Sequence, residues 1–223
     1  DIMIDSPLMR FFNRQVETWD DARHRYQQLQ GVKTRELVCD AITINVQWNP
    51  ARIASTGASI DKETIAKRPC FLCEANRPKE QTKKIIDEHF ELLVNPFPIL
   101  PTHFTIPSLR HEPQRILGNY GEMFNLLDEY PEMMVFYNGP KCGASAPDHA
   151  HFQAGTSGVL PLQRSWQRLS RNLTPILEGE DGEGIWNIND YPVAALLIKS
   201  NTKKSGQRLF NIVYNSLPQN EGE

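Results

Sequence analysis

The segment from Asn138 to Gly155 constrains the fold of this chain more than any other part of the sequence. A loop of small residues leads into two histidines and a glutamine at alternate positions, His149, His151 and Gln153. Alternate side chains of a β-strand share one face, so we expect these three to point together into one site. The residues between them are expected on the opposite, packed face. Such an array places a nucleophile and an amide donor around one phosphate, which suggests a nucleotide carried on a histidine.

The composition is that of a globular protein. The chain has 223 residues, enough to bury a real core, with 39% hydrophobic and 23% charged residues. A net charge of −3 argues against general binding to nucleic acid or to anionic membranes. No apolar run approaches the length of a membrane span, and the start, Asp-Ile-Met-Ile-Asp, is not typical of a signal peptide. We therefore expect a cytoplasmic protein.

The hydrophobic pattern predicts helices mixed with short strands. A first helix is expected over residues 7–30, with Ser6 as N-cap and Gly31 at its end. Alternation over residues 35–48 predicts a half-buried strand that Asp40-Ala41 turns back on residues 35–39. Further strands are expected at 91–94, 103–106, 133–137 and 193–199, helices at 113–130, 160–172 and 207–217, and a loop at 178–190. Without a βαβ rhythm or a glycine fingerprint, the fold class is α+β on an antiparallel sheet.

Two of the four cysteines, Cys70 and Cys73, have the spacing of a metal or redox pair. A tight turn would bring both sulfurs to one side, where they can bind one metal ion together with histidines. A thioredoxin-like redox pair is the alternative, but the prolines on both sides do not supply its strand and helix. Cys39 and Cys142 are expected to be small buried residues. The histidines available as further ligands are His89, His103, His111 and His149.

The histidine strand also has alternatives. The simplest alternative is that both histidines are structural, with their hydrogen bonds satisfied on a polar face of the sheet. A cupin would need a glutamate and a later histidine downstream, and an amidohydrolase barrel would place the pair on its first strand. The preceding small residues favour a phosphate site, because Gly143 lets backbone N–H groups approach an anion and Ser145 adds a hydroxyl donor.

Four segments in order resemble the histidine triad superfamily. The closest resemblance is to the branch with galactose-1-phosphate uridylyltransferase, dinucleoside polyphosphate phosphorylases and GDP-hexose phosphorylases, where a glutamine replaces the last histidine as Gln153 does here. The segment Cys70-Phe-Leu-Cys73-Glu-Ala-Asn76-Arg77-Pro78 is similar to the metal motif of the uridylyltransferases. Their nucleoside-binding Asn-Asp-Phe resembles Asn95-Pro-Phe97, and their histidine-bearing strand resembles His103-Phe-Thr-Ile-Pro107. The matches cover residues 35–155 and imply a HIT-like antiparallel sheet with flanking helices.

The resemblance implies a role for each matching residue. His151 would attack the α-phosphorus, its other ring N–H held by a backbone carbonyl or similar acceptor. Gln153 would donate to a phosphate oxygen, and Ser145 would hold the leaving group. Arg52 and Lys141 are candidates to neutralise phosphate charge. The predicted nucleotide-binding residues are Asn95 and Phe97 at the ribose and base, with Arg52, Asn138 and Gly143.

The metal site implied by the resemblance is a closed Cys₂His₂ set of Cys70, Cys73, His103 and His149. We expect it to hold structural zinc, with iron as the alternative. His149 could instead hydrogen-bond within the catalytic site, as in triad proteins whose first histidine binds no metal. His111 is the next ligand to test.

The organisation expected is one HIT-like domain over residues 1–223. It would comprise an N-terminal helix over 1–34, the core over 35–155 and an extension over 156–223. Asp148, Ala150 and Phe152 depart from the uridylyltransferase pattern, and no second triad-like half follows. The expected alternatives are therefore an acceptor region that is shortened, one that is missing, and one contributed by a partner subunit in a homodimer.

The predicted activity is a nucleotidyltransferase or phosphorylase. It would pass a nucleoside monophosphate from a nucleotide-sugar or dinucleoside polyphosphate to phosphate or a sugar phosphate. The alternatives are a hydrolase of the same strand chemistry and a zinc-stabilised nucleotide-binding module without turnover. The sequence leaves the base, the sugar and the acceptor open.

Overall fold

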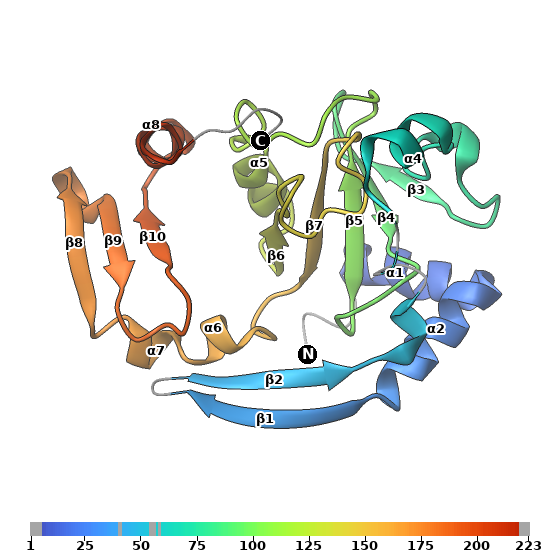
Figure 1. Ribbon diagram of the computed structural model, residues 1–223, viewed down its shortest axis with the longest axis horizontal. Coiled ribbons are helices and arrows are strands. Elements are labelled where there is room, and N and C mark those ends of the chain that lie inside the picture. Colours follow the sequence, from blue (N-terminus) through green and yellow to red (C-terminus); the bar gives the residue numbers. More distant parts are fainter. Residues whose placement is uncertain (1–5, 40–41, 54–56, 58, 219–223) are drawn as a thin grey trace.

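The computed structural model describes residues 6–39, 42–53, 57 and 59–218 (Figure 1). Two helices, α1 (Pro7–Thr18) and α2 (Asp20–Gln30), begin the described chain. The Ser6 hydroxyl accepts a hydrogen bond from the Met9 N–H at 3.2 Å, which confirms the predicted N-cap. The prediction of one continuous helix over 7–30 is wrong at Trp19. The extended backbone of Trp19 (φ −119°, ψ 99°) separates the two helices. Its side chain is only 4% exposed, so the helical path is broken at a residue whose side chain is buried.

A two-stranded antiparallel hairpin follows, formed by β1 (Lys33–Cys39) and β2 (Ile42–Trp48). The pairing is as predicted, although the turn residues 40–41 themselves lie outside the described residues. The sequence predicted that one face of this strand would be buried along its length, but only the first residue of β2 is buried. Ile42 is 4% exposed whereas Trp48 is 61% exposed. The reason is that the hairpin extends away from the main sheet and touches other elements mainly near its tip (Figure 1).

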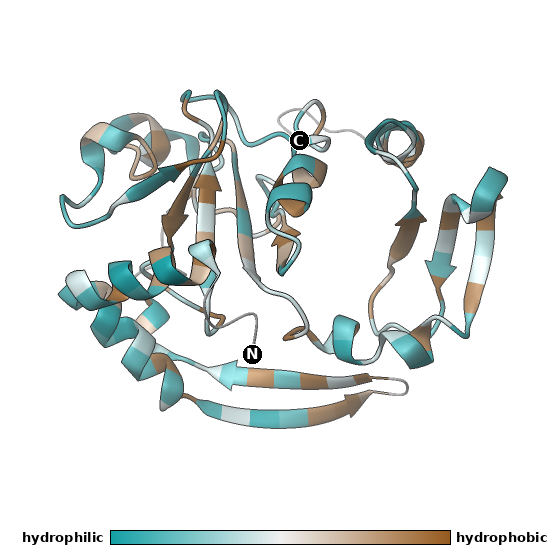
Figure 2. Ribbon diagram, turned by 180° about the vertical axis from the view of Figure 1, so that it is seen from behind, coloured by the Kyte–Doolittle hydropathy of each residue, from teal (hydrophilic) through white to brown (hydrophobic). Residues whose placement is uncertain are grey.

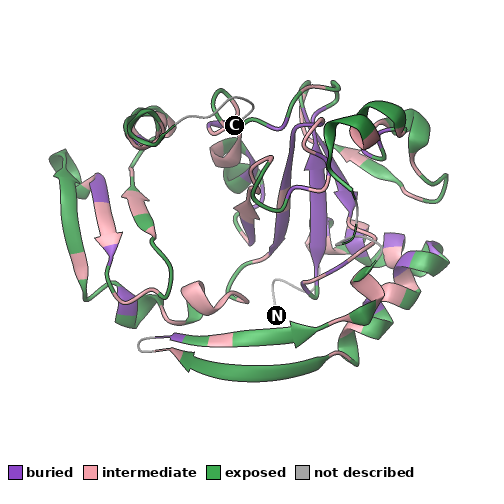
Figure 3. Ribbon diagram, viewed as in Figure 1, coloured by how far each residue is buried: buried purple, intermediate pink, exposed green. Residues whose placement is uncertain are grey.

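The central element is a five-stranded sheet with the order β3-β4-β5-β7-β6, in which every neighbouring pair is antiparallel. This confirms the α+β class with an antiparallel sheet. Burial is concentrated in its central strands (Figure 3), whereas hydrophobic residues occur in these strands and in the other elements too (Figure 2). The strand bounds are β3 Lys83–Ile85, β4 Glu91–Val94, β5 His103–Pro107, β6 Met133–Phe136 and β7 His151–Thr156.

The main core lies between this sheet and the helices. One cluster of buried residues joins α1, α2, α5 (Glu122–Glu129) and strands β4 to β7. The predicted helix over 113–130 is shorter than expected, because Gly118 adopts a left-handed φ of +92° and the α-helix begins only at Glu122.

The C-terminal part forms a second, three-stranded antiparallel sheet with the order β10-β9-β8. Its small core includes Ile42 of β2, Leu169 and Ile188, so the tip of the hairpin packs on this sheet. The loop predicted over 178–190 is wrong, because β9 lies within it and pairs with strands on both sides. The elements are α6 Pro161–Arg164, α7 Trp166–Leu169, β8 Leu173–Glu178, η3 Glu180–Gly182, β9 Gly184–Ile188, β10 Leu196–Lys199 and α8 Lys203–Ser216.

Helix α8 confirms the helix expected near the C-terminus and packs against the segment before α5. The rings of Phe210 and Tyr120 stack at 4.0 Å between centroids. The division of the chain into one domain with a C-terminal extension remains a prediction. None of the helices in the described part of the chain combines the length and the apolar character needed to cross a membrane.

Candidate functional site

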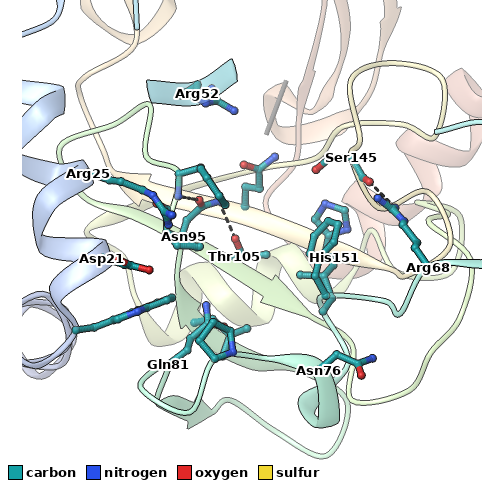
Figure 4. A pocket seen from close by; sticks show the side chains of 18 of the residues that line it. Asp21, Arg25, Arg52, Arg68, Asn76, Gln81, Asn95, Thr105, Ser145 and His151 are labelled. Atoms are coloured by element: carbon teal, nitrogen blue, oxygen red, sulfur yellow. Dashed lines mark hydrogen bonds between the residues drawn. The ribbon is translucent and has the colours of Figure 1, made fainter. Parts of the chain in front are cut away.

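A cavity of about 520 Å³ lies between α2, strands β4, β5 and β7, and the loop that precedes β7 (Figure 4). It brings together side chains up to 134 positions apart in the sequence, from Trp19 beside α2 to Gln153 on β7. Seven residues predicted for catalysis or nucleotide binding line it, and these are Arg52, Asn95, Phe97, Gly143, Ser145, His151 and Gln153.

His151 begins β7 and is 7% exposed. Its ring Nδ1 lies 2.8 Å from the carbonyl oxygen of His149, an acceptor only, so Nδ1 carries the proton and donates. Nε2 is then the unprotonated ring nitrogen. Burial, as the main cause, lowers the pKa of His151 and so favours this neutral form.

The backbone of His151 is held by Gln114, which is fully buried. The Gln114 side chain accepts a hydrogen bond from the His151 N–H at 2.7 Å and donates to the His151 carbonyl at 3.0 Å. The same amide nitrogen donates to the Asn138 carbonyl at 3.0 Å. Gln114 thus joins the start of β7 to the start of the preceding loop. The sequence analysis missed it, since a single glutamine after a proline carries no local signal.

Gln153 is oriented from both sides. Its side-chain oxygen lies 2.9 Å from Nε2 of His103, and its amide nitrogen donates to Oδ1 of Asn138 at 2.8 Å. Nδ1 of His103 lies 3.3 Å from the Ile99 N–H and accepts from it, so Nε2 of His103 carries the proton and donates to Gln153. Gln153, with its amide plane fixed by these two contacts, lines the cavity. Asn138 does not line the cavity but fixes the residue that does.

The loop before β7 also contributes its backbone. Gly143 has a left-handed φ of +91°, a conformation that favours glycine. The Ser145 carbonyl accepts a hydrogen bond from the Arg68 guanidinium at 2.8 Å, and Arg68 also lies 3.5 Å from the Asp148 carboxylate. Arg68 therefore fastens the loop and lines the cavity as well. Lys141, predicted as a phosphate-binding candidate, is exposed and does not line the cavity.

Asn95 and Phe97 form the opposite part of the lining. The Asn95 side chain donates to the Thr105 hydroxyl at 2.9 Å and accepts from the Phe97 N–H at 2.8 Å, which fixes the turn after β4. The Arg25 guanidinium lies over the Phe97 ring at 4.2 Å from its centroid. Arg25 and Arg68, neither of which the sequence singled out, place two further cations beside the cavity with Arg52.

A second cluster lies directly behind His151. The ligand atoms of Cys70, Cys73, His111 and His149 all lie within 4.8 Å of one another. Nδ1 of His149 is 3.4 Å from the Cys70 sulfur, and Nδ1 of His111 is 3.3 Å from the Cys73 sulfur. A tetrahedral zinc ion with ordinary Zn–S and Zn–N bonds places sulfur and nitrogen about 3.5 Å apart. This Cys₂His₂ cluster could therefore bind a metal.

The surroundings of the cluster also suit a metal. Nε2 of His149 donates to the Ser108 carbonyl at 2.8 Å, and Nε2 of His111 lies 3.7 Å from the Asp148 carboxylate. Outer contacts of this kind orient histidines whose other nitrogen binds a metal. Burial raises the pKa of the Cys73 thiol, and the neighbouring Cys70 raises it further. A bound cation would offset both effects and hold the sulfurs as thiolates.

The structure corrects one predicted ligand. His103 does not join the cluster. His111 was expected only as an alternative to His149, but both of these histidines belong to the cluster. Strand β5 pairs His103 with Gly155 and Pro107 with His151, so His103 lies about 20 Å along the strands from the level of His149. His149 itself precedes β7 and faces the cysteines, so the expectation that it shares the face of His151 and Gln153 is also corrected.

Comparison with known proteins adds the following. Residues 11–156 match the family model described as Domain of unknown function (DUF4922). No curated protein matches the chain. Among solved structures, yeast Ap4A phosphorylase Apa2 in complex with AMP is similar at 18% identity and a TM-score of 0.48, over 91% of this chain and 69% of that chain. Its complex with Ap4A is similar at 16% identity and a TM-score of 0.43, over 89% of this chain and 71% of that chain.

Proposed function

We propose that this chain, which belongs to the DUF4922 family, is a nucleotidyltransferase or phosphorylase that works through a covalent nucleotidyl-histidine on His151. The donor would be a nucleotide-sugar or a dinucleoside polyphosphate, and the acceptor would be phosphate or a sugar phosphate. The observation that carries the proposal is the hydrogen bond from Nδ1 of His151 to the His149 carbonyl, because it leaves Nε2 as a nucleophile at the cavity.

The reaction would proceed in two in-line steps. In the first, the lone pair of Nε2 forms a bond to the α-phosphorus, and the bond from phosphorus to the bridging oxygen breaks. The leaving group departs with that electron pair, as a sugar phosphate or a nucleotide. In the second step an acceptor phosphate oxygen attacks the same phosphorus, the P–N bond breaks, and His151 recovers its lone pair. Such a sequence gives ping-pong kinetics.

Phosphoryl chemistry of this kind depends on positioning and on charge stabilisation. The free amide N–H of Gln153 would donate to a non-bridging phosphate oxygen, and the Ser145 hydroxyl would hold the leaving group. Arg52 and Arg68 would offset the negative charge of the phosphates. Asn95 and Phe97 would contact the ribose and base, with Asn138 and Gly143 shaping the phosphate loop.

The metal would be structural zinc, with iron as the alternative, held by Cys70, Cys73, His111 and His149. When bound, the ion would fix the segment before β7 so that His151 starts the strand in one position. All four ligands would come from the protein, which leaves no open position for substrate.

The test is the intact mass of the protein after incubation with ADP-glucose, GDP-glucose, UDP-glucose and diadenosine tetraphosphate. We expect an acid-labile adduct of one nucleoside monophosphate that disappears in His151→Ala. A matched control is His89→Ala, because His89 is exposed and lies outside the cavity. Ligand binding without an adduct or turnover from any donor would overturn the proposal, and release of free monophosphate without an acceptor would identify the hydrolase alternative.

A further inference from the structure

One end of the cavity carries a charged pair that the proposed chemistry does not use. Asp21 and Arg25 come from α2, one helical turn apart, and both line the cavity. Figure 4 shows them on the side opposite His151, Ser145 and Arg68, together with Asn95. A nucleotide whose α-phosphorus lies at His151 and whose ribose lies at Asn95 would direct its base toward this pair.

The two side chains are placed separately and do not neutralise each other. Arg25 donates to the Pro96 carbonyl at 3.3 Å and lies over Phe97, which holds its guanidinium at the cavity wall. Among the contacts of the described residues, Asp20 pairs with Arg23 at 2.5 Å, and no ion pair joins Asp21 to Arg25. Asp21 therefore presents an exposed carboxylate at the cavity, one helical turn before the Arg25 guanidinium that lies over Phe97.

We infer that the base of the donor is guanine and that Asp21 reads it, an inference that rests on the proposed function for the placement of the α-phosphate. Guanine presents two neighbouring N–H donors, N1–H and the N2 amino group, followed by the O6 acceptor. A carboxylate can accept both N–H groups at once, and a guanidinium can donate to O6. The order carboxylate then guanidinium along α2 matches the order of these groups on the base edge.

The other bases do not complement this pair. Adenine presents one amino donor and an acceptor at N1, which would face the carboxylate oxygen. Uracil presents a single N–H between two carbonyl oxygens, so one carbonyl would face the carboxylate. Hypoxanthine is the informative analogue, since it keeps N1–H and O6 and lacks only the N2 amino group.

The experiment compares the wild type with Asp21→Asn and with the matched control Asp20→Asn. Both aspartates lie in the first turn of α2, where either would interact with the helix dipole, but only Asp21 lines the cavity. The measurements are dissociation constants for GMP, IMP, AMP and UMP by calorimetry. Rates of adduct formation are also measured with GDP-glucose, IDP-glucose, ADP-glucose and the tetraphosphates of diguanosine and diadenosine.

We expect GMP and the guanine donors to be preferred over adenine and uracil by about 10- to 100-fold, the range for one bidentate contact to a base edge. Asp21→Asn should remove most of this preference and reduce the ratio of guanine to hypoxanthine toward one. Asp20→Asn should leave both unchanged. Equal or better binding of AMP or UMP, or a loss in Asp21→Asn that is the same for all bases, would overturn the inference.

The outcomes separate the two proposals. An adduct that forms best from adenine or uracil donors would support the nucleotidyl-histidine and refute the assignment of guanine. Preferential binding of GMP that depends on Asp21, without an adduct from any donor, would support the base assignment and refute the proposed transfer.

Discussion

His103 should make the stability of the folded chain depend on pH. Its side chain is 1% exposed, and burial, aided by the positive charge of Arg52, lowers its pKa to about 4. Both ring nitrogens are engaged in the neutral form, since Nε2 donates to Gln153 and Nδ1 accepts from Ile99. Protonation would place a positive charge in a buried position. It would also convert Nδ1 from an acceptor into a donor that faces the Ile99 N–H.

The magnitude follows from the two pKa values. In the unfolded chain a histidine titrates near pH 6.5, so between about pH 6.5 and pH 4 the unfolded state binds a proton that folded His103 does not. The free energy of unfolding must therefore fall as the pH is lowered through this range. With these values His103 accounts for a loss of roughly 2 kcal/mol between pH 7 and pH 5.

The assay is urea unfolding of the wild type and His103→Gln at pH 7, 6 and 5. Glutamine can still donate to Gln153 and does not titrate, so the variant should lose about 2 kcal/mol less than the wild type over this range. Effects of acid on the Cys₂His₂ cluster occur in both proteins and cancel in the difference. His89→Gln, at an exposed histidine, is the control and should keep the wild-type dependence. Parallel pH profiles for the wild type and His103→Gln would show that His103 is not the source of this loss of stability.

Two further predictions concern the metal cluster and the core behind the site. Cys70→Ser should reduce the metal content by elemental analysis from about one ion per chain to near zero and lower the free energy of unfolding by several kcal/mol. Cys142→Ser should change neither, because Cys142 is exposed and not buried as the sequence predicted, and a metal-free wild type would contradict the assignment. Phe152→Ala should cost about 3–5 kcal/mol in urea unfolding, since this ring is 2% exposed and lies 5.4 Å from the Phe90 ring. A cost below 1 kcal/mol would show that the core collapses around the missing ring.

The local patterns that the sequence revealed are those with a short period. The alternation in the hairpin, the apolar strands β4 and β5, and Ser6 as an N-cap depend on neighbours within a few residues. Breaks within a predicted helix were missed, because they do not depend on neighbours within a few residues. The break at Trp19 coincides with the burial of its indole, and nothing in the helical pattern of 7–30 marks it.

The candidate site divides in the same way. The spacing of Cys70 and Cys73 predicted a metal pair, and His151 and Gln153 after a loop of small residues predicted a phosphate site, because spacing and residue type are local properties. Which other histidine lies beside the cysteines depends on how the chain folds. The antiparallel register of β5 against β7 carries His111 to the level of His149 and leaves His103 beside Gln153, where it orients an amide. Gln114 and the two α2 residues Asp21 and Arg25 likewise come from parts of the chain far from β7, and hydrogen bonds and cavity walls depend on distances that no spacing in the sequence encodes.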